Sequence, residues 1–152
     1  MKTKHLKAAG AAVSLLIASG PALATSTGPQ TLGAFAEATD VFQFTCPART
    51  VMVRWNVSDT TVIVNVPARI RMGMTKVGQI HFFQREDNLP GPSGEGGSFS
   101  TSGALAGGAG TYQAIIYKTD AGADSYEGHI SCTRDDGVAI TPVLPAVPQQ
   151  NQ

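Results

Sequence analysis

Cys46 and Cys132 are the only two cysteines of the chain, and their placement indicates which chemistry they perform. Each lies in phase with the apolar positions of an alternating segment, so both side chains are expected to point inward. A redox-active pair would need an exposed thiol of low pKa and usually a close spacing such as C-x-x-C. We therefore predict a structural disulfide formed in an oxidising compartment. It would close a loop of about 85 residues and contribute roughly 4 kcal/mol.

Four residues carry the soft or borderline ligands that a periplasmic copper site uses. Two of them, Met72 and Met74, share one face of a predicted strand at i and i+2, and the other two are His81 and His129. Methionine more often fills hydrophobic cores, so core packing is the alternative for both methionines. A surface pair with Glu127 is the alternative for His129.

Three carboxylates at predicted strand ends and turns could offer calcium its hard oxygen ligands: Asp40, Asp120 and Asp124. The turn from Asp120 to Asp124 is the best local candidate. It lacks the dense acidic spacing of an EF-hand, so an ordinary solvated turn is the alternative. Apart from calcium, the sequence suggests no cofactor.

The sequence contains no recognisable set of catalytic residues. A nucleophilic triad needs a base beside an activated serine or cysteine, and no G-x-S-x-G elbow is present. Nothing singles out two carboxylates for glycoside hydrolysis. We therefore predict a protein that binds rather than catalyses. Tyr117, which projects to the face opposite the apolar one, is the predicted contact for a protein or glycan partner.

Eight segments alternate or are rich in β-branched residues, and turns of glycine, proline and aspartate separate them. Residues 58–59, 119–124 and 135–137 are predicted turns, and 87–97 and 103–110 are predicted loops. No helical period follows the first 24 residues, so we predict an all-β antiparallel sandwich or jelly roll. The expected strands are 40–46, 51–57, 61–66, 69–74, 79–84, 98–101, 111–118 and 125–133, with a brief pairing at 138–141.

The first 24 residues have the pattern of a secretory signal peptide. A lysine-rich start precedes an apolar run from Ala8 to Ala18, and Ala22-Leu23-Ala24 offers a cleavage site. We predict cleavage after Ala24 and no membrane span in the product. The expected location is the periplasm or the exterior of a Gram-negative cell. The remaining chain is divided into a polar leader (25–37), of which residues 25–30 are expected to be loosely ordered, the sandwich (38–141) and a disordered proline-rich tail (142–152).

The charge of the processed chain argues against nucleic acid as a partner. Cleavage would remove three of the eleven Lys and Arg residues and none of the eleven Asp and Glu residues, leaving a formal charge of −3. The remaining basic residues form no stripe, whereas nucleic-acid binding depends on clustered phosphate contacts.

Two short segments resemble the bacterial pre-peptidase C-terminal domain family. ATDVFQFTC (38–46) is similar to the entry strand of that family, and GTYQAIIY (110–117) with AGADSY (121–126) is similar to its closing strands. The resemblance implies a secreted β-sandwich with a non-catalytic accessory role, and some members bind calcium. Residues 69–85 and the loop 87–97 depart from the family pattern, so only the fold carries over.

These features together predict an exported, non-catalytic β-sandwich that acts by binding or assembly at the cell envelope. Three alternatives remain open at this point. The first is a calcium-binding accessory module and the second a periplasmic copper-binding protein. The third is a fimbrial-type subunit whose incomplete sandwich would need a donated strand.

Overall fold

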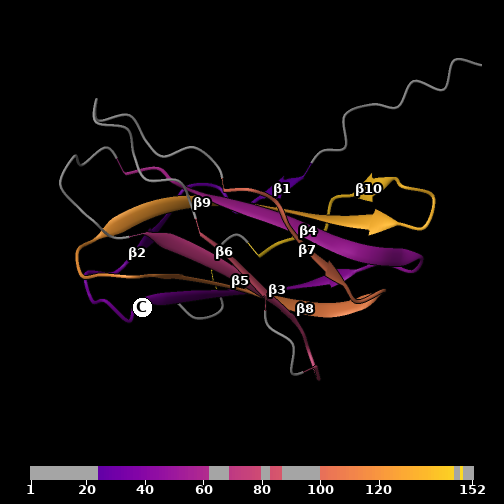
Figure 1. Ribbon diagram of the computed structural model, residues 1–152, viewed down its shortest axis with the longest axis horizontal. Helices are drawn as coiled ribbons and strands as arrows, with labels where there is room; N and C mark the ends of the chain where they lie inside the picture. Colours follow the sequence, from indigo (N-terminus) through magenta and orange to yellow (C-terminus); the bar gives the residue numbers. More distant parts are fainter. Residues whose placement is uncertain (1–23, 62–68, 80–82, 87–99, 146–147, 149–152) are drawn as a thin grey trace, which may run out of the picture.

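The computed structural model describes residues 24–61, 69–79, 83–86, 100–145 and 148. This part of the chain contains ten β-strands in two antiparallel sheets, and no helix (Figure 1). The all-β sandwich predicted from the alternating segments is therefore confirmed. The strands are β1 (Thr25–Ser26), β2 (Gln30–Leu32), β3 (Thr39–Cys46), β4 (Thr50–Asp59), β5 (Ile70–Lys76), β6 (Phe83–Glu86), β7 (Gly103–Ala106), β8 (Gly110–Lys118), β9 (Asp124–Arg134) and β10 (Ala139–Ile140).

The first sheet is built around its two long strands, β4 and β9. In the first sheet β9 pairs with β4 on one side and with the short strands β1, β2 and β10 on the other, and β4 also pairs with β7. The second sheet has the order β3-β8-β5-β6. Because side chains alternate along each strand, every second residue faces the space between the sheets.

Apolar residues from both sheets fill that space. Phe42, Phe44, Met72, Tyr112 and Ile116 of the second sheet pack with core residues of the first sheet that include Val53, Val57, Tyr126 and Ile130. The indole Nε1 of Trp55 in β4 donates to the carbonyl of Met72 in β5 at 3.1 Å, which joins the two layers. The core therefore combines apolar burial with a satisfied polar group.

Five strands follow the sequence prediction within three residues at each end: β3, β4, β5, β8 and β9. The prediction of a turn at Ser58-Asp59 is wrong, because β4 continues through both residues and pairs with β9 as far as Tyr126. The predicted loop at 103–110 is wrong in its first half, where β7 pairs with β4. Gly103 is needed there, because a Cβ at this position would lie 2.4 Å from the Trp55 ring.

The prediction that residues 25–30 are loosely ordered is wrong. β1 and β2 both pair with β9, and Thr27 and Leu32 are buried. Thr27 Oγ1 accepts a hydrogen bond from the Gly128 amide at 3.0 Å, and the Thr27 amide donates to the Gly128 carbonyl at 2.8 Å. Backbone pairing to a long central strand holds this polar segment in place despite its composition.

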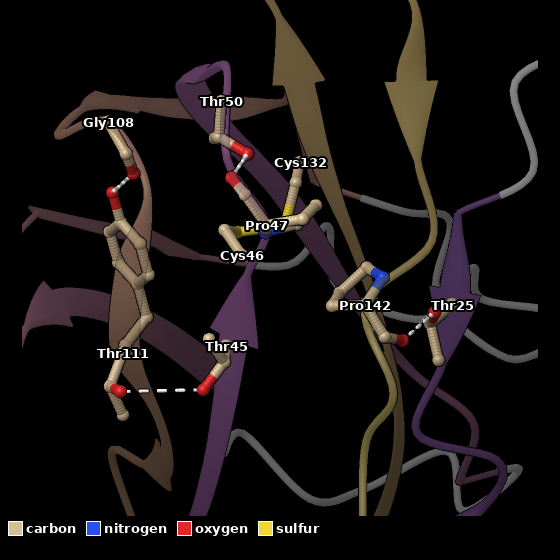
Figure 2. The surroundings of a disulfide bond; sticks show 10 residues. Thr25, Thr45, Cys46, Pro47, Thr50, Gly108, Thr111, Cys132 and Pro142 are labelled. Atoms are coloured by element: carbon tan, nitrogen blue, oxygen red, sulfur yellow. Dashed lines mark hydrogen bonds between the residues drawn. A yellow bond between two sulfur atoms is a disulfide. The ribbon is translucent and has the colours of Figure 1, made fainter.

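The tail prediction is corrected for its described residues. Pro142 is buried, and its carbonyl accepts a 2.5 Å hydrogen bond from the Thr25 hydroxyl (Figure 2). Leu144 packs on the core. β10 confirms the brief pairing predicted just before it. Residues 62–66, 80–82 and 98–99 of the predicted strands 61–66, 79–84 and 98–101 lie outside the described residues, as do the loop 87–97 and the signal peptide up to residue 23.

Within the described ranges, no helix is both long and apolar enough to cross a bilayer.

Candidate functional site

The predicted disulfide is confirmed. Cys46 at the end of β3 and Cys132 in β9 are bonded across the two sheets, with their Cα atoms 5.8 Å apart (Figure 2). The ring of Phe44 stacks on Tyr112 nearby, with centroids 5.7 Å apart, and the Tyr112 hydroxyl donates to the Gly108 carbonyl at 2.5 Å. We call this region, which also contains Lys76, the disulfide end of the sandwich.

The structure does not assemble the copper site. Met72 and Met74 are completely buried between the sheets, where they fill the core. His129 alternates with the buried residues of β9 and therefore lies on the outer face of the first sheet, and its Nε2 is 3.2 Å from Glu127 Oε1. His81 lies outside the described residues. A copper site made of both methionines and His129 is contradicted, because the first sheet separates them.

The three predicted calcium ligands are not gathered either. Asp40 and Asp124 are buried, whereas Asp120 is exposed in a turn, where it accepts a hydrogen bond from the Ala121 amide. Among the described residues, no group of three or more His, Cys, Asp or Glu side chains is placed to hold a metal ion. Asp40 and Asp124 instead belong to a buried polar cluster at the end of the sandwich opposite the disulfide.

We call this cluster the acid end; its residues are Asp40, Asp59, Asp124, Lys118 and Tyr126. The Tyr126 hydroxyl donates to Asp40 Oδ2 at 2.6 Å, which joins the sheets. Asp124 accepts hydrogen bonds from the Thr61 hydroxyl and the Ser125 amide. The Lys118 ammonium donates to the carbonyls of Gly33 and Gly122.

The acid end shifts the protonation of its members. The pKa of Asp59 is raised to about 6: burial raises it most, the hydrogen bond from the Thr61 amide lowers it, and the neighbouring Asp124 carboxylate raises it. Burial lowers the pKa of the Lys118 ammonium, and Asp124 opposes that shift. Burial and then Asp40 raise the pKa of Tyr126. These groups are buried within the fold and serve its stability, so the candidate binding site lies elsewhere.

A pocket of about 140 Å³ lies on the outer face of the first sheet and is open to solvent. We call it the outer pocket. It is lined by Ala24, Arg54, Trp55, Asn56, Ser102, His129 and Ser131.

Strand register explains why these residues meet. In β4, Arg54 and Asn56 alternate with the buried Val53, Trp55 and Val57, so they face outward. Arg54 lies opposite Ser131, and Asn56 opposite His129, on the neighbouring strand β9. On the far side of β9, Ser26 of β1 lies opposite His129. The pocket therefore lies on paired strands rather than on a loop.

The polar groups of the outer pocket are only partly satisfied. Arg54 is exposed and forms no ion pair with any residue that the structure describes. Asn56 Oδ1 is buried, and no described residue donates to it. Glu127, next to the pocket, accepts from the Ser26 hydroxyl at 2.5 Å, which together with His129 lowers the pKa of this carboxyl. The pocket thus offers the exposed guanidinium of Arg54 to a ligand.

Tyr117 lies on the outer face of the second sheet, partly exposed, between Thr39 of β3 and Arg71 of β5. Its orientation agrees with the sequence analysis, but it lies on the sheet opposite the outer pocket. A binding role for Tyr117 stays a prediction.

Sequence reasoning missed Arg54, Asn56 and Ser131 as site residues. Their signal was present as the polar phase of two predicted strands. The register that brings them together with Ala24 and Ser102 is a long-range property, which no local pattern contains.

No family model matches this sequence, and no curated protein matches it. The structure is similar to the pre-peptidase C-terminal domain of a collagenase from Bacillus anthracis, with a TM-score of 0.49 and 16% sequence identity. The similarity covers 71% of this chain and 89% of that one. This is the family that residues 38–46 and 110–126 resemble. A likeness of this size concerns the fold alone, and the function is argued below from this chain's own residues.

Proposed function

We propose that this protein is an exported, non-catalytic β-sandwich module that binds a component of the cell envelope through the outer pocket. The observation that carries the proposal is Arg54, which is exposed at the outer pocket and free of acidic partners in the described part of the chain.

The rigidity of the site supports binding. Both pocket-bearing strands are long, are paired over nine residue positions and are fixed to the core by the inward side chains between the pocket residues. A pocket on such a scaffold loses little conformational entropy when a ligand binds.

The disulfide supports export. It joins residues 86 positions apart, and bonds of this kind persist in the periplasm or outside the cell but not in a reducing cytosol. The signal-peptide pattern of the first 24 residues points to the same compartments.

The test has two measurements on the full chain produced in a Gram-negative host. Fractionation with thiol labelling should place the protein outside the cytoplasm with both cysteines oxidised. Co-sedimentation of the purified protein with washed cell envelopes should then give saturable binding that Arg54→Ala weakens about tenfold.

Arg71→Ala is the matched control, because Arg71 lies on the outer face of the second sheet, away from the pocket. It should bind as the unmodified protein does. A reduced cytoplasmic protein, or envelope binding that both variants lose equally, would overturn the proposal.

A further inference from the structure

Ala24 lines the outer pocket, and it is also the last residue of the predicted signal peptide. Cleavage after Ala24 hydrolyses the Ala24–Thr25 peptide bond: one water is consumed, the departing Ala24 gains a carboxylate and Thr25 gains a free α-amino group. The Thr25 nitrogen is directly bonded to the Ala24 carbonyl carbon before cleavage, so the new amine lies at the pocket wall. Processing thus removes one wall residue and adds a charged group in its place.

The new terminus is held at that position. Thr25 pairs with Ile130 of β9, its hydroxyl donates to the Pro142 carbonyl at 2.5 Å, and the next residue, Ser26, donates to Glu127 at 2.5 Å. An α-amino group has a pKa of about 8, so it is mostly an ammonium at neutral pH. With Arg54 it gives the processed pocket two cations, while the nearby Glu127 is already engaged by Ser26 and His129.

We propose that export processing completes the outer pocket as a site for a sugar acid, that is, a sugar ring bearing a carboxylate. The Thr25 ammonium and Arg54 bind the carboxylate, and the side chains of Asn56, Ser102 and Ser131, which line the pocket, bind the ring hydroxyls. This inference rests on the proposed function and names the ligand of the same site.

The chemistry of the lining selects this class over a simple anion. The side chains of Asn56, Ser102 and Ser131 line the pocket and can both donate and accept hydrogen bonds, as sugar hydroxyls do. A simple carboxylate can only accept them. With Ala24 in place the pocket measures about 140 Å³, which is the size of a single ring rather than of an extended chain segment.

The test uses the full chain, exported by a Gram-negative host and purified after processing. Intact mass should show that it begins at Thr25. Titration calorimetry with glucuronate is then expected to give a Kd of about a millimolar, with glucose and acetate each binding at least about tenfold more weakly. A polymer of uronic acid should bind more tightly than free glucuronate if the source in the envelope is a polysaccharide, and equally if it is the free sugar acid.

Two variants isolate the cations. Arg54→Ala should weaken glucuronate binding about tenfold, and Arg71→Ala should not change it. A variant with one alanine inserted between Ala24 and Thr25 moves the ammonium by one residue and refills the wall after cleavage. It should also bind about tenfold more weakly, with unchanged melting temperature.

Three results would overturn the inference: a mature terminus other than Thr25, equal affinity for glucuronate and glucose, or tighter binding of an acetylated dipeptide carboxylate than of glucuronate. If glucuronate fails but envelopes still bind through Arg54, the ligand class is wrong and the proposed function stands. If both fail, the proposed function falls as well.

Discussion

At one end of the sandwich, β3 and β9 are joined by the Cys46–Cys132 disulfide, whereas near the other end the same two strands carry Asp40 and Asp124, buried among polar groups. The disulfide end holds the sheets together with a covalent bond and stacked aromatic rings. The acid end holds them with the Tyr126–Asp40 hydrogen bond and the Lys118 ammonium.

The difference concerns how each end responds to its surroundings. A disulfide is insensitive to pH but depends on the redox state of the compartment. A buried set of carboxyl groups is insensitive to redox state but changes its interactions when a proton is lost. The stability of this protein therefore has two separate controls, and each can be removed without touching the other.

The largest effect should come from the disulfide. Replacing both cysteines by alanine (Cys46→Ala with Cys132→Ala) removes the link between two residues 86 positions apart, so the unfolded chain gains conformational entropy. The free energy of unfolding should fall by roughly 4 kcal/mol. Urea unfolding of the double variant measures the loss, and reduction of the unmodified protein should reproduce it. If neither change lowers the urea midpoint, the disulfide does not hold this end together.

Lys118 should be the next most important residue. Lys118→Met leaves the Gly33 and Gly122 carbonyls without their donor and removes the cation beside Asp124, which should cost about 3 kcal/mol.

Lys76→Met is the matched control at the disulfide end. Lys76 donates to the Gly107 carbonyl, lies 5.8 Å from the centroid of the Tyr112 ring and is only partly buried. Its replacement should cost about 1 kcal/mol. Equal losses in urea unfolding of the two variants would contradict the view that only one end relies on a buried cation.

The strands at both ends were predictable, because β3, β4, β5, β8 and β9 each contain a run in which apolar residues recur at every second position. β7 was not, since its Gly-Ala-Leu-Ala sequence resembles a connector and only the Trp55 ring across the pair explains why Gly103 is there. β1 and β2 were not predicted for a related reason. Their polar residues are held by backbone hydrogen bonds to β9, and no local sequence pattern indicates such bonds.

The sites also differ in how far the sequence predicts them. The disulfide was predictable from the oxidising compartment and from the inward-facing positions of both cysteines in their strands. The acid end and the outer pocket depend on register, which places Asn56 beside His129 and Tyr126 beside Asp59. Asp59 was assigned to a turn because aspartate favours turns, and tertiary pairing overrode that preference.

Asp59 should make stability depend on pH. Its pKa in the folded state is about 6, above the ordinary value of 3.8, so the folded protein holds this proton more tightly than the unfolded chain. The stabilisation is complete below about pH 4 and is lost as the pH rises through 6, by an amount on the order of 2 kcal/mol.

Asp59→Asn imitates the protonated side chain and should remove this loss between pH 5 and pH 7.5, as urea unfolding at both pH values would show. The exposed Asp120→Asn is the control and should retain it. A protein whose stability rises over this interval, in parallel with the Asp59→Asn variant, would contradict a raised pKa.

Calcium should have the smallest effect. A ligand that binds only the folded state raises the melting temperature by mass action, so millimolar calcium tests the predicted site directly. Asp40 already accepts from Tyr126, Asp124 from Thr61 and Ser125, and Lys118 supplies positive charge beside Asp124. We therefore expect a shift below about 1 °C at pH 7.5.

A rise of several degrees would contradict that expectation, and Asp124→Asn would then distinguish its source. If this variant abolished the rise while Asp120→Asn kept it, the buried carboxylates of the acid end would bind the cation. Because a divalent ion competes with the proton of Asp59, the rise should then shrink below pH 6. The acid end would in that case be stabilised by a metal ion above this pH and by protonation of Asp59 below it. The disulfide end would be unchanged at either pH.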